Sequence, residues 1–209
     1  MKITKLEHSG IIIEKDGENI IFDPVKFTKK LPEINNVVTI IITHKHSDHF
    51  QPEVIARILQ NSPNAKIFTT ADTAPNIENA ISVKAGDSHD VGNFKLDFFG
   101  KDHAAIIPGQ IPCENIGTAV DGRIVNPGDS FDLPDFTPEV LFTPIAAPWC
   151  KISESIDYVK KAHPRIVIPI HDAVLSDLGK KFNENWLDAA CSEIGAEFTS
   201  LVPNQSVSI

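Results

Sequence analysis

Residues 43–49 read T-H-K-H-S-D-H, so three histidines and one aspartate fall within six positions. The apolar run V-V-T-I-I-I at 37–42 directly precedes them and predicts a buried strand. Because side chains alternate along an extended chain, His44 and His46 project to the same side. Asp48 and His49 follow at the turn into the next helix. Imidazole and carboxylate suit Zn, Fe or Mn, so the segment predicts one metal at the strand end and a second at the turn.

Three more polar residues each follow an apolar strand farther along the chain: His103 in G-K-D-H-A, Asp129 in N-P-G-D-S and His171 in I-P-I-H-D. Strand ends meet at one rim of a sheet assembly, where function commonly lies, so we expect these residues to converge with the first cluster. A single histidine is more often a structural residue, and His-rich tags share this composition, but tags do not lie between a buried strand and a helix. His89 and His163 stand alone, and we interpret both as solvated loop positions.

The flanking elements follow from periodicity and turn signals. Strands are predicted at 2–7, 11–15, 19–23, 37–43, 66–70, 81–84, 94–99, 117–121, 123–126, 139–143, 165–170, 196–201 and 205–209, the last two as a pair. Helices are predicted from Pro52 through E-V-I-A-R-I-L-Q and at 71–80, 154–162 and 183–194. This order of elements predicts an α/β (α+β) protein with two packed sheets and helices outside them. Since no repeat or linker interrupts the chain, we expect one domain over 1–209.

Composition narrows the class of protein. The chain has 209 residues, of which 42% are hydrophobic and 22% charged, as in an ordinary globular protein. A formal charge of -9 disfavours nonspecific binding to nucleic acid or anionic membranes. No run approaches the eighteen apolar residues of a membrane span, and M-K-I-T-K-L-E-H does not resemble a signal peptide. Three dispersed cysteines argue against a disulfide framework, so we expect a cytoplasmic protein.

The set T-H-x-H-x-D-H, a lone histidine, G-D and a last histidine after a strand resembles the metallo-β-lactamase superfamily of hydrolases. The stretches L-E-H-S-G-I-I-I-E, I-I-F-D-P, T-P-I-A-A-P-W at 143–149 and I-V-I-P-I-H-D at 166–172 resemble one branch of it. That branch contains bacterial metal-dependent hydrolases of unknown substrate and L-ascorbate-6-phosphate lactonase. The resemblance covers nearly the whole chain. It implies a four-layer αββα sandwich of two mixed β-sheets flanked by helices.

The resemblance also implies a role for each of the seven matching residues as a metal ligand. His44, His46 and His103 would bind a first metal, Asp48, His49 and His171 a second, and Asp129 would bridge the two. The metals are expected to be two Zn²⁺ ions, with Mn²⁺ or Fe²⁺ as alternatives. Such a pair generates a bridging hydroxide near neutral pH, which Asp48 would orient. Diiron oxygen-reducing relatives carry a Glu where this chain has His46, which favours a zinc hydrolase.

Further residues are candidates for the surroundings of the metals. Asp23, which ends a predicted strand, is the best candidate to accept a hydrogen bond from a ligating histidine, although Asp23-Pro24 alone also suits a turn. His8 matches a recurrent histidine of the branch and is assigned either to the pocket or to a structural role. Trp149 either lines the pocket or anchors the core. Asp172 is interpreted as a helix cap rather than as a partner of His171.

These residues together predict a metal-dependent hydrolase, with a binuclear zinc site expected, that cleaves an ester, lactone or phosphoester bond in a small polar molecule. One alternative is a nuclease or phosphodiesterase of the same superfamily, which the acidic chain without a basic arm disfavours. The other alternative is a non-catalytic metal-binding sensor, which the full set of seven ligand candidates disfavours. The expected partner is a small-molecule substrate, with no nucleic acid and no membrane. The sequence leaves the choice between a monomer and a homo-oligomer open.

Overall fold

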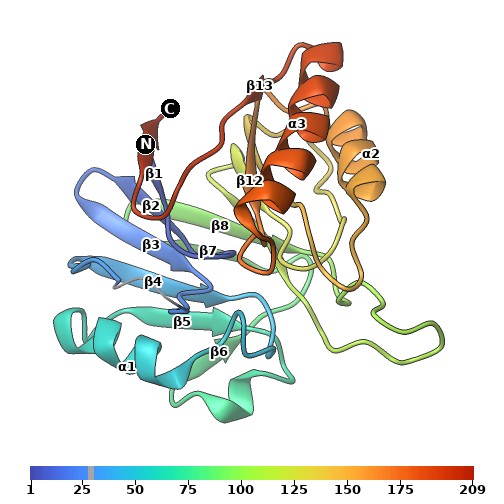
Figure 1. Ribbon diagram of the computed structural model, residues 1–209. Coiled ribbons are helices and arrows are strands. Elements are labelled where there is room, and N and C mark those ends of the chain that lie inside the picture. The colour runs from blue at the N-terminus through green and yellow to red at the C-terminus, as the bar shows by residue number, and fades with distance from the viewer. Residues whose placement is uncertain (28–30) are drawn as a thin grey trace.

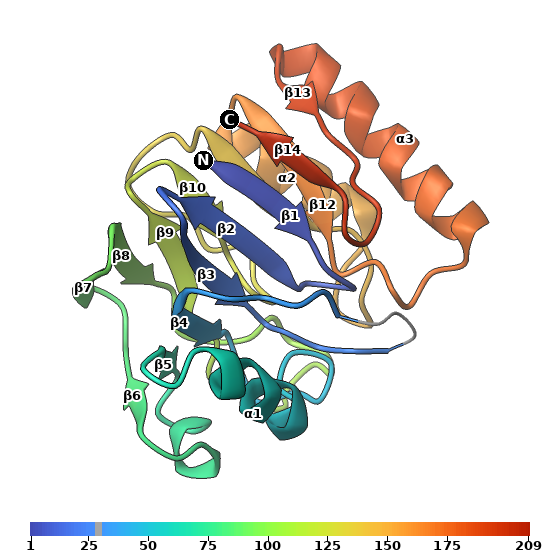
Figure 2. The ribbon, with the colours of Figure 1, turned by 90° about the vertical axis from the view of Figure 1, so that its left-hand side faces the viewer.

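The computed structural model describes residues 1–27 and 31–209. Two mixed β-sheets pack face to face, and helices cover their outer faces (Figure 1). Helix α1 (Pro52–Asn61) lies on the first sheet, while α2 (Ile152–Ala162) and α3 (Asp177–Ile194) lie on the second. This is the expected αββα order of layers, and Figure 2 shows the two helical layers on opposite sides of the sandwich.

The first sheet has the strand order β14-β1-β2-β3-β4-β5-β6 within the described residues. Its strands are β1 (Lys2–Lys5), β2 (Ile11–Lys15), β3 (Glu18–Phe22), β4 (Val37–Ile42), β5 (Lys66–Thr69), β6 (Ala80–Ser82) and β14 (Ser206–Ser208). The β2–β3 hairpin closes at Asp16-Gly17, where both residues have positive φ (51° and 81°), as a tight Asp-Gly turn requires. From β3 to β6 the neighbouring strands are parallel.

The second sheet has the order β13-β12-β11-β10-β9-β8-β7 in the same part of the chain. Its strands are β7 (Ser88–Val91), β8 (Phe94–Phe99), β9 (Gly117–Val120), β10 (Ile124–Asn126), β11 (Val140–Pro144), β12 (Ile166–Ile170) and β13 (Glu197–Phe198). The β7-β8-β9-β10 portion is antiparallel, and β10 to β13 are parallel.

The central strands are apolar on both faces because each separates two cores. In β4, Ile41 packs into the core between the sheets, whereas Ile40 and Ile42 pack against α1. In β12, Ile168 enters the core between the sheets, and Val167 packs under α2 and α3. Buried parallel strands therefore read as continuous apolar runs, as the sequence pattern of 37–42 predicted.

Several predicted elements differ from the structure. The helix expected at 71–80 is wrong, since only a 3₁₀ turn (Ala74–Asn76) forms there around its proline. Strand β7 was missed, and the interpretation of His89 as a loop residue is wrong, because His89 lies in this strand with its ring 4.9 Å from that of Phe68.

The C-terminal part also differs from expectation. Helix α3 begins six residues earlier than residue 183, at Asp177. The expected pairing of the last two strands is wrong, because β13 pairs with β12 and β14 pairs with β1, in different sheets. None of the helices within 1–27 and 31–209 has the length and apolar character that a membrane crossing requires.

Candidate metal centre

The strands that carry the candidate residues run in one direction within each sheet. In the first sheet, β1 and β3 are both antiparallel to β2, and β4 is parallel to β3. In the second, β8 and β10 are both antiparallel to β9, while β11 and β12 are parallel to β10. The carboxyl ends of such strands meet at one edge, where ligands commonly bind in sheets of this kind. The residues that follow them are His8 after β1, Asp23 after β3, His44 after β4, His103 after β8, Asp129 after β10, Trp149 after β11 and His171 after β12.

The structure brings all seven candidate ligands together. Possible ligand atoms lie within 4.8 Å of one another in each of three groups: His44, His46 and His103; His8, Asp48, His49 and His171; and His44, His49 and Asp129. The first two groups match the residues expected around the first and second metals, with His8 added to the second. Asp129 joins residues from both groups, which is the position that a bridging ligand needs.

Asp129 lies at the centre of the cluster and is almost fully buried. Its Oδ2 atom is 3.3 Å from Nε2 of His103, 3.0 Å from Nε2 of His171 and 3.9 Å from Nε2 of His44. Its Oδ1 atom is 3.2 Å from Nε2 of His49. One carboxylate thus faces four imidazoles from three separate segments of the chain.

Hydrogen bonds to Nδ1 fix the tautomers of these four histidines. Asp23 accepts from Nδ1 of His49 at 2.7 Å, and main-chain carbonyl oxygens accept from Nδ1 of His103 and His171 at 2.5 and 2.6 Å. The hydroxyl of Thr43 donates to Asp23 and therefore accepts from Nδ1 of His44 at 3.0 Å. Since each Nδ1 carries the hydrogen in the neutral ring, each Nε2 presents its lone pair to the cluster.

These inward nitrogens fit a bound cation. The Nε2 atoms of His44, His49, His103 and His171 and Oδ1 of Asp129 are buried and have no hydrogen-bond partner among the described residues. Buried polar atoms are normally paired, and lone pairs that face a carboxylate at about 3 Å repel unless positive charge lies between them. Zinc, manganese and iron all accept such nitrogen and oxygen donors. The donor set therefore fits the divalent metals expected from the sequence.

The electrostatics of the cluster agree with this fit. Burial alone would raise the pKa of Asp129, but the imidazoles of His49 and His171 hold that pKa well below its usual range. Burial alone would lower the pKa of His49, yet the carboxylates of Asp129 and Asp23 raise it well above the usual value. Asp129 is thus ionised, and the space between it and Nε2 of His49 attracts positive charge, which a proton supplies in the metal-free protein and a bound cation would supply in its place. Burial lowers the pKa of His44 well below its usual value, which leaves that ring neutral and able to ligate.

Asp23 supports the cluster from behind. Its Oδ1 accepts from the main-chain N–H of Thr43 at 2.8 Å, and its Oδ2 accepts from the Thr43 hydroxyl and from Nδ1 of His49, both at 2.7 Å. Asp23 has φ of 40°, a left-handed conformation that costs energy for a non-glycine residue. Asp23 thus bends the chain before Pro24 and accepts a hydrogen bond from a candidate ligand, His49.

An Asp23→Ala variant is expected to weaken metal binding by about 10–100-fold, because His49 loses the acceptor that holds its tautomer. Titration of the metal-free protein with Zn²⁺ against a chromogenic chelator measures this affinity. Asp16→Ala, at an exposed hairpin turn, is the control and should leave the affinity unchanged. If Asp23→Ala binds Zn²⁺ with wild-type affinity, Asp23 does not support the metal site.

The loop that carries Asp129 is held by a residue that the sequence did not single out. The side chain of Asn115 accepts from the main-chain N–H of Asp129 and donates to the carbonyl of Pro127, both at 2.9 Å. Gly128 has φ of +63°, and a Cβ atom there would lie 2.3 Å from Oδ1 of Asn115 and 2.9 Å from Cβ of Thr43. Only glycine fits this close approach, which explains the G-D pair.

Two further side chains contact the cluster. Trp149 is 9% exposed, and its Nε1 donates to Oδ2 of Asp129 at 3.1 Å, so it is both a core residue and part of the site. The Sγ atom of Cys113 lies 3.7 Å from Nε2 of His46. A tryptophan or cysteine far along the chain carries no local signal of such contacts, so sequence reasoning could not assign them.

A buried charge network beside the cluster joins β1 to the segment that follows β12. Lys5 is fully buried, and its Nζ donates to Oδ1 of Asp172 and to the carbonyl of His8, both at 3.1 Å. Burial lowers the pKa of Lys5, while Asp172 opposes that effect. Asp172 also contacts Lys180 at 3.0 Å. The interpretation of Asp172 as a helix cap is wrong, because Ser176 caps α3. Asp172 instead ties the segment after His171 to β1.

A cavity of about 740 Å³ opens beside the second group of candidate ligands. Its lining includes His8 and Asp48 together with apolar side chains of Phe27, Val174 and Val202. The size suits a small molecule. Beside His46 and His103, in contrast, there is a pocket of only about 50 Å³. A substrate thus has room on the side of the second group.

Comparisons with known proteins agree with the fold and show the family of the chain. Residues 2–171 match the family model described as "Beta-lactamase superfamily domain". Protein Rv0786c from Mycobacterium tuberculosis is 32% identical, over 84% of this chain and 86% of its own length. A "UPF0173 metal-dependent hydrolase" from Aeropyrum pernix is 25% identical, with 81% of each chain covered. The structure of Igni18, "a novel metallo hydrolase" from Ignicoccus hospitalis, aligns with a TM-score of 0.75 at 18% identity over 99% of this chain and 97% of that one.

Proposed function

Since the chain belongs to the β-lactamase superfamily, we propose that it is a metal-dependent hydrolase that binds two divalent ions, most simply Zn²⁺, at one end of its β-sandwich. The observation that carries the proposal is the set of buried Nε2 atoms that converge on Asp129 without hydrogen-bond partners among the described residues. The name of the Aeropyrum pernix relative supports the same chemistry. The comparisons support the superfamily, but they do not show the resemblance to L-ascorbate-6-phosphate lactonase.

His44, His46 and His103 would hold one ion, Asp48, His49 and His171 the other, and Asp129 would lie between them. Two bound metals supply a strong nucleophile from water at neutral pH and polarise a substrate oxygen. The protein contributes the positions of the ligands, the fixed tautomers and a largely buried site. Trp149 and Asp23 hold the carboxylate and the imidazole in place through the hydrogen bonds described above.

The cavity favours an uncharged ester or lactone over a phosphoester. Four of the side chains that line it are acidic: Glu7, Asp48, Asp172 and Asp177. Lys180, the lysine in that lining, is already paired with Asp172. A dianionic phosphate would therefore find no free lysine in this lining, whereas an ester with a modest apolar group would pack against Phe27, Val174 and Val202. The same acidic lining disfavours a nucleic acid as substrate.

Metal removal and a substrate panel test the proposal. The purified protein is expected to hydrolyse p-nitrophenyl acetate or a γ-lactone, to lose that activity after dialysis against a chelator and to regain it with Zn²⁺. A bis(p-nitrophenyl) phosphate assay on the same samples tests the phosphodiesterase alternative, and we expect slower turnover there. Two bound metals with no turnover of any substrate would favour a metal-binding sensor and would contradict the proposal.

A further inference from the structure

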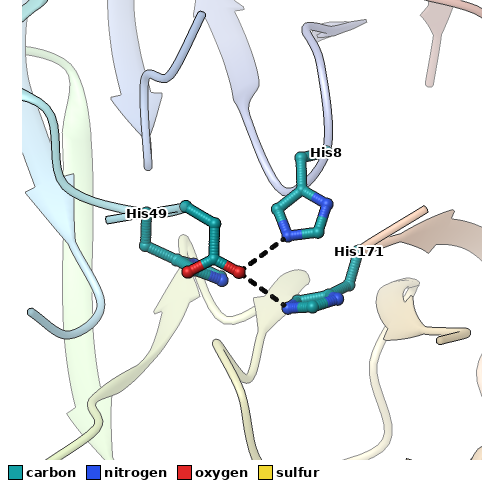
Figure 3. Close-up of side chains that lie close together, drawn as sticks. His8, His49 and His171 are labelled. Atoms are coloured by element: carbon teal, nitrogen blue, oxygen red, sulfur yellow. Dashed lines mark ion pairs between the residues drawn. The ribbon is translucent and has the colours of Figure 1, made fainter. Parts of the chain in front are cut away.

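His8 lies in the loop between β1 and β2, is only 1% exposed, and faces the second group of candidate ligands. Its ring centroid is 3.9 Å from that of His171 and 5.5 Å from that of His49. Oδ2 of Asp48 lies 3.3 Å from Nε2 of His8 and 3.6 Å from Nε2 of His171. Figure 3 shows nitrogens of these two labelled rings near the same carboxylate oxygen. By position alone, His8 is as close to this group as a fourth ligand would be.

The hydrogen bonding of His8 is the reverse of that of the candidate ligands. The main-chain N–H of Ala173 donates to Nδ1 of His8 at 3.2 Å. An atom that accepts a hydrogen bond from N–H carries no hydrogen, so the hydrogen of the neutral His8 ring is on Nε2. In His44, His49, His103 and His171 the hydrogen is on Nδ1 and the lone pair is on Nε2. An Nε2 that bears hydrogen cannot ligate a metal, although it can donate a hydrogen bond.

The backbone of His8 is held so that the ring cannot turn away easily. Its carbonyl accepts from Nζ of the buried Lys5 at 3.1 Å and from the main-chain N–H of His171 at 3.2 Å. His8 and His171 both have φ of 59°, a conformation that persists only when the surroundings determine it. The edge-on ring of Phe27, with centroids 5.5 Å apart, closes another side.

The Nε2–H group has no aligned acceptor within the described residues. Although Oδ2 of Asp48 is 3.3 Å away, Nε2 of His8 is buried without a hydrogen bond of acceptable geometry. A buried N–H group without a hydrogen bond costs free energy unless another oxygen atom accepts from it. His8 and Asp48 both line the cavity of about 740 Å³, so a molecule in that cavity reaches the donor.

We propose that His8 is not a metal ligand but a catalytic hydrogen-bond donor, whose Nε2–H binds the carbonyl oxygen of an ester or lactone in the cavity. The assignment rests on the proposed function. When a nucleophile adds to the carbonyl carbon, the C=O π electrons move to this oxygen, and the His8 N–H stabilises the negative charge without giving up its proton. The charge then returns to re-form C=O as the bond to the leaving alkoxide breaks. Loss of one such donor costs about 10²–10³-fold in kcat.

A matched pair of variants tests the donor. His8→Gln keeps an N–H group near the position of Nε2, while His8→Met has similar volume and no donor, and both lose the Nδ1 acceptor. We expect both variants to bind two Zn²⁺ ions by elemental analysis. With p-nitrophenyl acetate, the kcat of His8→Met should be about 10²–10³-fold below that of the wild type. The kcat of His8→Gln should be at least tenfold above that of His8→Met. Loss of one Zn²⁺ in both variants, or equal kcat for Gln and Met, overturns the assignment.

Nuclear magnetic resonance of the wild-type protein tests the same point if the variants do not fold. In Zn²⁺-loaded protein labelled with ¹⁵N-histidine, we expect a protonated Nε2 and an unprotonated Nδ1 for His8, the opposite of the ligating rings. Acetate, the simplest ester product, should shift the Nε2–H signal of His8. A metal-bound Nε2, or a signal that saturating acetate does not move, overturns the proposal. A shifted signal in a protein that hydrolyses no substrate would refute the proposed function while supporting the donor.

Discussion

Asp129→Asn is expected to remove at least one of the two metals. The rate of hydrolysis is expected to fall by more than the roughly 100-fold that follows when a residue hydrogen-bonded to a metal ligand is lost. The reason is its central position. Its two oxygens lie 3.0–3.3 Å from Nε2 of His49, His103 and His171. No other carboxylate among the described residues comes so close to these three nitrogens. Asparagine keeps the shape but has one acceptor oxygen and no charge, so two cations would lose their shared counter-ion.

Elemental analysis and p-nitrophenyl acetate hydrolysis on the same preparation measure this effect. Asp135→Asn is a suitable control, because Asp135 is exposed on the same loop. Thermal unfolding of the metal-free variant separates loss of metal from loss of fold, and we expect little change in stability, since Asn removes a buried charge as well as a partner. Full activity with two bound metals would place the bridging role on another residue.

His46→Ala is the second change with a large expected effect. His46 is half-buried, and its ring centroid lies 4.7 Å from those of both His44 and His103, so three imidazoles enclose one position. Removal of one of them leaves two nitrogen donors, too few to hold an ion against competing chelators. Metal content is therefore expected to fall from two ions per chain towards one, with the second group still occupied, and hydrolysis is expected to fall with it.

His163→Ala provides the matched control, since His163 is exposed at the end of α2. It should keep both metals and wild-type activity. Two ions per chain in His46→Ala would show that His46 is not a ligand and would leave Cys113, at 3.7 Å from it, as the residue to examine next.

Much of the site could be predicted because its residues obey one local rule. His44, His103, Asp129 and His171 each follow an apolar strand, and the shared direction of these strands brings their ends together. The apolar run at 37–42 predicted strand β4. The motif at 43–49 contains members of both groups of candidate ligands. The order of layers followed from the same apolar runs, which must be covered on both faces.

Other features depend on tertiary contacts that leave no local pattern. The support of Asp129 by Asn115, the hydrogen bond from Trp149 and the buried Lys5–Asp172 pair join residues 14, 20 and 167 positions apart. The proposed pocket role of His8 depends on the direction of one N–H group, from Ala173, which the sequence does not reveal. The helix expected at 71–80 failed because Pro75 lies within it and the segment packs against the core with only two partly buried hydrophobic side chains, Ile77 and Ala80.

Anomalous diffraction from crystals of the Zn²⁺-loaded protein tests the central claim most directly. Two peaks are expected at the end of the sandwich, one within reach of His44, His46 and His103 and the other within reach of Asp48, His49 and His171, with Asp129 between them. A single peak, peaks elsewhere on the chain, or none at all under saturating zinc would contradict the assignment of a two-metal centre.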